Sequence, residues 1–165
     1  MRKRLVVCIL VAAAITVLLT ACANQSPSET VAHAGKYTIS YPSEWGEMET
    51  ESSGKLLGET TRVYFVQPTD DSMIAFGDLT TKGVKVADAL TTSRPLNANG
   101  ETTNIVSGDM AGFKTWWDQG TNRVIIAYLA DNAKVTGVIA AVVPTSDTNT
   151  LDQVDEVIAS LRYEE

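Results

Sequence analysis

Two stretches near the C-terminal end are almost unbroken runs of apolar residues, and they constrain the fold more than any other feature. They cover residues 124–130 and 138–143, with polar turn residues between them. A strand with one face in water alternates polar and apolar residues, whereas an unbroken apolar strand is covered on both faces. The two runs therefore predict a sheet with helices on each side, or with a helix on one side and loops on the other.

Period-two alternation and turn residues predict further strands before these runs. Tyr37, Ile39 and Tyr41 alternate with polar residues, and Pro42 ends that strand. The polar stretch 47–60 is predicted to be a loop. The other strands are expected at residues 62–67, 73–79, 103–107, 112–117, 123–130 and 135–143.

Two helices are predicted in the domain. Residues 86–90 place three apolar side chains on one face at helical spacing, which indicates a short helix. A longer helix follows the last strand, where Thr150 is a suitable N-cap and Gln153 completes a capping box. The apolar stripe of this helix consists of Leu151, Val154, Val157, Ile158 and Leu161.

The N-terminal end has the form of an export signal. Arg2, Lys3 and Arg4 precede an apolar run over residues 5–19. The basic residues stay on the cytoplasmic side, so the rest of the chain is expected to be translocated. The run is shorter than the roughly 20 residues of a membrane-spanning helix.

The run ends in Leu19-Thr20-Ala21-Cys22, which resembles the bacterial lipobox. This resemblance implies cleavage between Ala21 and Cys22 and a diacylglycerol thioether on Cys22. Two acyl chains, at about 0.8 kcal/mol per buried CH₂, anchor a protein stably where one chain does not. The chain is therefore expected to be an extracytoplasmic lipoprotein of the cell membrane. In a host with two membranes, Ala23 favours sorting to the outer membrane.

Cleavage would leave 144 residues, enough for one domain with its own core. The predicted organisation is a signal peptide over 1–21, a flexible linker over 22–35 and a globular domain over 36–163. Loss of the three basic leader residues leaves 10 basic against 20 acidic residues, a net charge of −10. Such an acidic domain repels phosphate backbones, so nucleic acid is not an expected partner.

Both ends of the domain resemble a known family. Residues 37–45 contain Tyr41-Pro42-Ser43-Glu44-Trp45, which is similar to the opening Y-P-x-x-W strand of PsbP-like and DcrB-like domains. Residues 158–163 resemble the end of their final helix. The resemblance covers 36–163. It implies an α+β fold, with a central, mainly antiparallel sheet flanked by helices in an α/β/α sandwich. Members of this kind are often accessory proteins that bind other proteins, and the family implies no shared catalytic site.

The residues supply little chemistry beyond this. One histidine in the linker, His33, and no cysteine in the domain make a zinc site unexpected. A serine nucleophile would lack a histidine base. Residues 147–155 begin like a calcium loop but lack its glycine and its final glutamate. We therefore expect no catalytic residue, metal or cofactor. An acid–base pair formed by Asp78 and Asp118 stays open as an alternative.

Trp116 and Trp117 are the candidate binding residues. As neighbours on a strand they point to opposite faces of the sheet, so one of them could anchor a partner. The leading hypothesis is a lipid-anchored, non-catalytic envelope protein that binds another protein as an accessory or assembly module. The alternatives are a small-molecule binder that uses one of the two tryptophans and a surface hydrolase that works through carboxylates.

Overall fold

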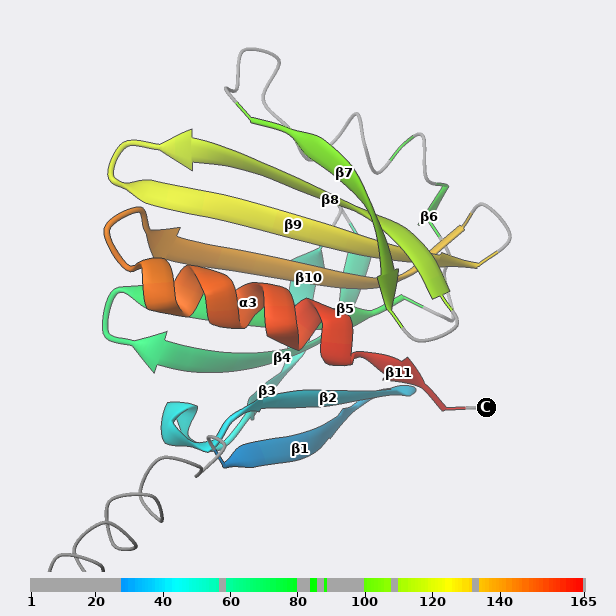
Figure 1. Cartoon of the computed structure of the whole chain (residues 1–165). Helices are drawn as coiled ribbons and strands as arrows, with labels where there is room; N and C mark the ends of the chain where they lie inside the picture. The colour runs from blue at the N-terminus through cyan, green and yellow to red at the C-terminus, as the bar shows by residue number, and fades with distance from the viewer. Residues whose placement is uncertain are drawn as a thin grey trace, which may run out of the picture.

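An eight-stranded antiparallel sheet forms the body of the domain (Figure 1). The structure is a computed structural model that describes residues 28–56, 59–79, 84–85, 88, 100–107, 110–131 and 134–164. In spatial order the strands of the main path are β3 (Glu49–Leu56), β4 (Glu59–Thr69), β5 (Ser72–Asp78), β10 (Lys134–Pro144), β9 (Asn122–Asp131), β8 (Met110–Gln119) and β7 (Thr102–Ser107). The eighth strand, β6 (Val84–Lys85), pairs with the start of β10.

A second, three-stranded sheet lies beside the single described α-helix. Its strands are β1 (Glu29–Ala34), β2 (Tyr37–Pro42) and β11 (Arg162–Tyr163), and the 3₁₀ helix η1 (Ser43–Trp45) follows β2. The helix, α3 (Thr148–Ser160), packs along β2, where the Ser160 hydroxyl accepts the Ser40 N–H at 2.9 Å. Both units cover the same face of the large sheet (Figure 1).

The main core lies between the large sheet and this covering layer. Its buried side chains come from alternate positions of the central strands, from the inner face of β2 and from α3. Val154, Val157 and Ile158 of the predicted helical stripe are buried there, and Leu151 packs at the margin. Trp45 is buried and stacks on Tyr41 with ring centroids 6.3 Å apart.

A second, smaller core lies on the opposite face of the large sheet. It is formed by Leu79, Tyr128, Val135 and Val138. The burial on both faces that the two apolar runs predict is confirmed, because both β9 and β10 bury side chains on both faces. Among the described residues, one helix and the small sheet cover one face of the large sheet. Helices on both faces, as expected, are not found among these residues.

Polar strands account for most errors of the sequence interpretation. The expected linker 22–35 includes β1, and the expected loop 47–60 contains β3 and the start of β4. Strand β4 also runs past Pro68 to Thr69, with a register irregularity after Val66. An edge strand pairs its backbone on one side only, and few apolar residues are enough to form it. Its sequence is therefore similar to that of a loop.

The closing helix begins earlier than predicted. Its N-cap is Asp147, whose carboxylate accepts the Thr150 N–H at 3.1 Å, so Thr150 lies within the first turn. The helix ends at Ser160, and the next residues form β11. The predicted helix at 86–90 lies, apart from Asp88, outside the described residues, as do the predicted signal peptide, Ala21 and Cys22. Within the described part of the chain, no helix has the length and apolar character needed to cross a bilayer.

Candidate functional site

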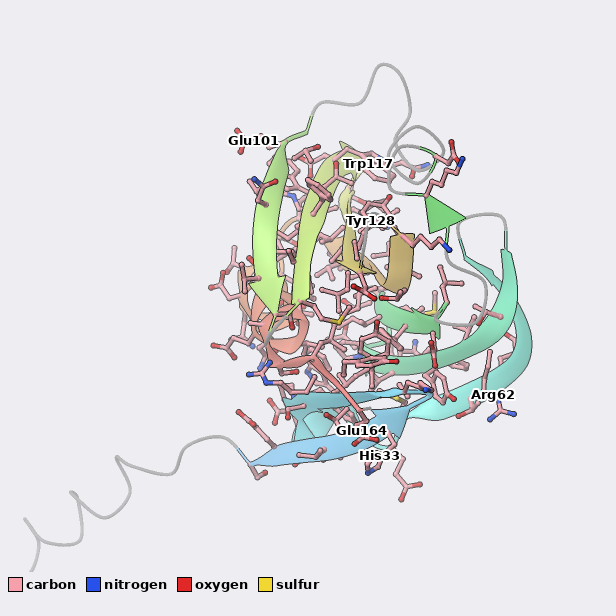
Figure 2. The ribbon with its side chains drawn as sticks, turned by 90° about the vertical axis from the view of Figure 1, so that its right-hand side faces the viewer. His33, Arg62, Glu101, Trp117, Tyr128 and Glu164 are labelled. Atoms are coloured by element: carbon pink, nitrogen blue, oxygen red, sulfur yellow. The ribbon has the colours of Figure 1, made fainter. Side chains whose placement is uncertain are left out.

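The two tryptophans point to opposite faces, as the sequence predicts. Trp116 lies opposite Ile125 on the helix side of the sheet, and Trp117 lies opposite Val124 on the other side. Trp117 is buried, with 7% of its surface exposed (Figure 2). Its ring therefore contributes to packing and offers little surface to a ligand.

Trp116 is half-buried, and a charged neighbour covers its ring. The Arg123 guanidinium lies 4.0 Å from the ring centroid, a cation–π arrangement. The same guanidinium donates to the two Asp118 oxygens at 2.8 and 3.2 Å. This hydrogen bond holds the pKa of Asp118 below its usual range. A ligand that stacked on Trp116 would have to displace Arg123, so this residue is a weaker anchor than the sequence suggested.

Asp78 and Asp118 lie at opposite ends of the sheet. Asp78 pairs with Gly137 on β10. Asp118 pairs with Arg123, which lies opposite Val143 on the same strand β10. At a rise of about 3.3 Å per residue, the two carboxylates are separated by about 20 Å along the strands. They cannot share a substrate bond, so the proposed acid–base pair is wrong.

The other polar groups near Asp78 have structural partners. Its carboxylate accepts the Lys36 N–H at 2.8 Å. The Tyr37 hydroxyl lies 2.8 Å from the Thr136 hydroxyl. Burial raises the pKa of Tyr37 to about 12. At neutral pH it is a protonated phenol that ties β2 to β10. His33 is exposed and lies 3.2 Å from Glu164 at the edge of the small sheet (Figure 2).

The hollow beneath the covering layer is too small for an organic ligand. It is about 10 Å³ in volume and apolar, and it lies between β2, α3 and the centre of the large sheet. This is about the volume that one water molecule needs. Among the described residues, no cluster of three or more histidine, cysteine or acidic side chains could hold a metal ion.

An accessible feature of the described surface is the outer side of strand β7, which we call the β7 edge (Thr102–Ser107). In the described part of the chain, β7 pairs with β8 and no strand pairs with its other side. The strand has no charged residue and no proline. Val106 is 75% exposed, and Thr102, Thr103 and Asn104 are exposed as well.

An open hollow lies next to the β7 edge, on the helix side of the sheet. It has a volume of about 170 Å³. It lies between β7, β8 and α3 and is lined by Ile105, Val106, Lys114, Asp155, Ile158 and Ala159. We call it the β7–α3 hollow. Its lining combines aliphatic side chains with one ion pair, Lys114–Asp155.

Two contacts hold the walls of this hollow together. The Lys114 ammonium donates to both Asp155 oxygens, at 2.9 and 2.8 Å, and so joins β8 to α3. The buried Ser107 hydroxyl donates to the Leu161 carbonyl at 2.8 Å and fixes the end of β7 to the end of the helix. The sequence interpretation predicted a strand here but did not predict that it lies at an edge. The signal available was the run of six uncharged residues.

The chain was compared with protein families, curated proteins and solved structures. No protein-family model matches it, and no curated protein matches it. Among solved structures it is similar to the solution structure of cyanobacterial PsbP (CyanoP) from Synechocystis sp. PCC 6803. The TM-score is 0.54 at 10% sequence identity, and the match covers 86% of this chain and 95% of that one. At this identity the likeness concerns the fold alone. The domain has a PsbP-like fold, which confirms that part of the resemblance, whereas the DcrB-like part stays a prediction.

Proposed function

We propose that this chain is a lipid-anchored, extracytoplasmic module of the cell envelope that binds a protein partner and acts as an accessory or assembly factor. The observation that carries this proposal is the β7 edge, an uncharged strand whose outer side has no strand partner among the described residues, beside an open hollow. An edge of this kind is a template for pairing with another chain, and natural proteins usually protect it. Strand addition to such an edge is an established mode of protein recognition.

The sequence before the domain supports the anchor. Leu19-Thr20-Ala21-Cys22 has the form of a lipobox, and β1 begins at Glu29. Residues 22–28 extend to about 25 Å at most, because a fully extended chain spans about 3.5 Å per residue. The Ser28 carbonyl accepts the Ser43 N–H at 2.9 Å, so the tether joins the domain next to η1. A lipidated Cys22 would therefore keep the domain close to a membrane surface, where a membrane-bound partner is within reach.

The geometry gives less support to the alternatives. A hydrolase that works through carboxylates would need Asp78 and Asp118 close together, but the two residues lie at opposite ends of the sheet. A small-molecule binder that uses Trp116 would have to displace Arg123 from the ring. At the β7 edge, the described residues include no strand that a partner would have to displace.

The anchor is tested by metabolic labelling with an alkyne-bearing fatty acid. We expect the wild-type chain to be labelled and Cys22→Ser to lose the label completely. Cys8→Ser is the matched control and keeps the label, since Cys8 lies inside the predicted leader. Equal labelling of wild type and Cys22→Ser would contradict the anchor.

The partner is tested by crosslinking in intact cells of the native host, followed by mass spectrometry. We expect one defined envelope protein to be captured with the wild-type chain and to be depleted with Cys22→Ser. Capture of no specific protein by either form would contradict the proposed function. Screens of the domain against soluble ligands and esters would then follow.

A further inference from the structure

We propose that the partner binds as an added β-strand on the β7 edge, and that this strand carries an aliphatic side chain and at least one basic residue. This inference rests on the proposed function and gives it a surface and a partner chemistry. It combines three observations: the backbone at the edge, the hollow beside it and the charge around it.

The backbone of β7 is ready to accept a strand. In the described part of the chain its outer N–H and C=O groups have no strand partner. The inner side is fixed by six paired positions with β8, from Thr102 opposite Thr115 to Ser107 opposite Met110. A strand that is already held on one side loses little conformational freedom on binding, which favours affinity.

The β7–α3 hollow supplies a place for one side chain of the added strand. Side chains alternate between the two faces of a sheet, so every second residue of an added strand would point toward α3. There the half-buried Ile105 and the exposed Ala159 line the hollow, and the buried Ile158 contributes to its wall. A volume of about 170 Å³ suits a leucine or isoleucine side chain. Burying such a side chain strengthens binding by roughly tenfold or more.

The charge around the edge selects a basic strand. Glu101 directly precedes β7 and is exposed, and no cation among the described residues pairs with it (Figure 2). Lys114 is already neutralised by Asp155. Asp152 is exposed one turn before Asp155 on the helix. Arg162 lies just after the end of the helix, close to the end of β7 that Ser107 fixes, and its guanidinium is engaged with the Ala159 and Leu161 carbonyls.

The same charge balance disfavours a second copy of this chain as the occupant. The expected mature chain has a net charge of −10, so a pair of copies would bring two acidic surfaces together. Complementary charge steers association, whereas like charge opposes it. A basic strand from another protein satisfies the edge, the hollow and the surrounding charge at once.

The first test uses the full chain, purified in nonionic detergent, and three short peptides with blocked ends. The basic peptide is Lys-Val-Thr-Leu-Thr-Val-Lys. The acidic peptide has Glu in place of both Lys, and the third is the basic peptide with Ser in place of Leu. We expect the basic peptide to bind most tightly by fluorescence anisotropy. The serine peptide should bind roughly tenfold more weakly, because its central side chain leaves the hollow empty.

Hydrogen exchange then locates the binding. The basic peptide is expected to protect backbone amides of β7 and to leave those of β3 at the opposite edge unchanged. Protection of β3 or of the small sheet without β7 would overturn the inference. Absence of protection anywhere at saturating basic peptide would overturn it as well.

Two substitutions and one matched control test the chemistry. Glu101→Lys should weaken the basic peptide by about threefold to fivefold and strengthen the acidic one, since one exposed ion pair is reversed. Ala159→Phe should fill the hollow and remove the preference for leucine over serine. Glu51→Lys, at an exposed position on β3, should change neither affinity. Both charge reversals lie on exposed side chains, so the domain is expected to fold in each case.

Crosslinking in cells separates this inference from the proposed function. A photoreactive residue replaces Val106 on the β7 edge or, as the control, the exposed Val31 on β1. We expect Val106 to link to a defined basic strand of the partner and Val31 to link to nothing. A partner captured by general crosslinking but never through Val106 would overturn the inference and leave the proposed function standing. A link from Val106 to another copy of this chain would replace the partner strand with a dimer.

Discussion

The two end strands of the large sheet, β3 and β7, differ in how they meet solvent. Strand β3 carries Glu49 and Glu51 at exposed positions, and its register with β4 is irregular between Glu51 and Gly54. Charges and register irregularities are devices that keep an edge from pairing with another chain. The β7 edge has no charge, no proline and no irregularity in its register with β8. The two edges of the sheet therefore differ in the features that prevent pairing with another chain. We place the partner at the β7 edge, which lacks these features.

The two ends also differ in their attachment to the rest of the domain. The β7 end is fixed to α3 by the Ser107 hydrogen bond and by the Lys114–Asp155 ion pair one strand further in. Strand β3 follows η1 and pairs with β4. A fixed edge keeps its backbone groups in the geometry that a new strand needs. The comparison therefore predicts that a disruptive substitution near β7 lowers both stability and binding, whereas a comparable substitution in β3 has only a local effect.

The largest expected effect comes from Gly112→Ala on β8. A Cβ at this position would overlap the Tyr128 carbonyl and lie 3.3 Å from the Leu129 Cα, so the backbone of β9 would have to move. Overpacking that displaces backbone in a packed sheet costs roughly 3 kcal/mol. We expect a loss of about that size in the free energy of unfolding, measured by urea denaturation with tryptophan fluorescence.

Gly54→Ala on β3 is the matched control. Its new Cβ would meet the Val63 side chain, not a carbonyl, and the edge strand can shift outward to relieve the contact. The loss should be about 1 kcal/mol, at the lower end of overpacking costs. Equal losses in the two variants would show that the β3 end is held as firmly as the β7 end, and the contrast between the edges would fail.

The next effect acts on both ends alike, because it originates at Tyr37, which packs from β2 onto β10, the central strand of the large sheet. The pKa of Tyr37 is raised to about 12, mainly by burial, while an exposed tyrosine titrates near 10. The unfolded chain therefore loses this proton first as pH rises. The stability contributed by Tyr37 is present below pH 10 and is lost between pH 10 and about 12. The full loss is between about 2 and 3 kcal/mol.

Urea denaturation at pH 8 to 11 measures this loss, and hydrogen exchange at β3 and β7 should report it equally. Tyr37→Phe removes the hydroxyl and should flatten most of the pH dependence, at the cost of the contact with Thr136. The smaller remainder is assigned to Tyr41, whose pKa burial also raises. A β7 strand that loosens with pH before β3 would indicate a local alkaline transition that the structure does not explain.

A smaller and more local effect is expected from Ser107→Ala. The serine hydroxyl is buried and donates to the Leu161 carbonyl, so its removal costs about 1 kcal/mol. Arg162 also donates to that carbonyl at 2.7 Å, which limits the cost. We expect faster hydrogen exchange in β7 and weaker binding of the basic peptide. Thr50→Ala at an exposed position of β3 is the control and should leave β7 unchanged.

Sequence reasoning succeeded where burial dictates the residue type and failed where backbone pairing alone makes a strand. The apolar runs of β9 and β10 predict strands buried on both faces, and the alternation of Trp116 and Trp117 predicts their opposite directions. Strands β1 and β3 were missed because each pairs on one side only, and because β3 is mostly polar while half of the residues of β1 are polar. Such strands are formed by their neighbours, not by their own composition.

The candidate site could be predicted only in part for a related reason. The strand at residues 103–107 is visible in the sequence, but its place at the end of the sheet depends on which strands pair. The β7–α3 hollow joins Ile105 to Ile158, which are far apart in the chain. The sequence favours Trp116 and Trp117 as binding residues because they are large aromatic residues. One of them is buried in a core, and the other is covered by an arginine.

The smallest expected effect concerns the β8–β9 hairpin, which separates β7 from the centre of the sheet. Arg123 holds the pKa of Asp118 below its usual range, chiefly through a hydrogen bond. A folded-state pKa below the unfolded value stabilises the protein above the usual pKa, and this stability disappears as pH falls through the lowered pKa. Asp118→Asn removes the contribution, so wild type and variant should differ in urea denaturation at pH 6 and converge as the pH falls through the lowered pKa of Asp118. Because the pair is exposed, the difference should be smaller than that of Ser107→Ala.

Glu51→Gln on β3 removes an exposed carboxylate that has no ion pair among the described residues, and it should show no such difference. A difference between wild type and Asp118→Asn that does not shrink as the pH falls would mean that the charge of the Asp118 carboxylate is not its source.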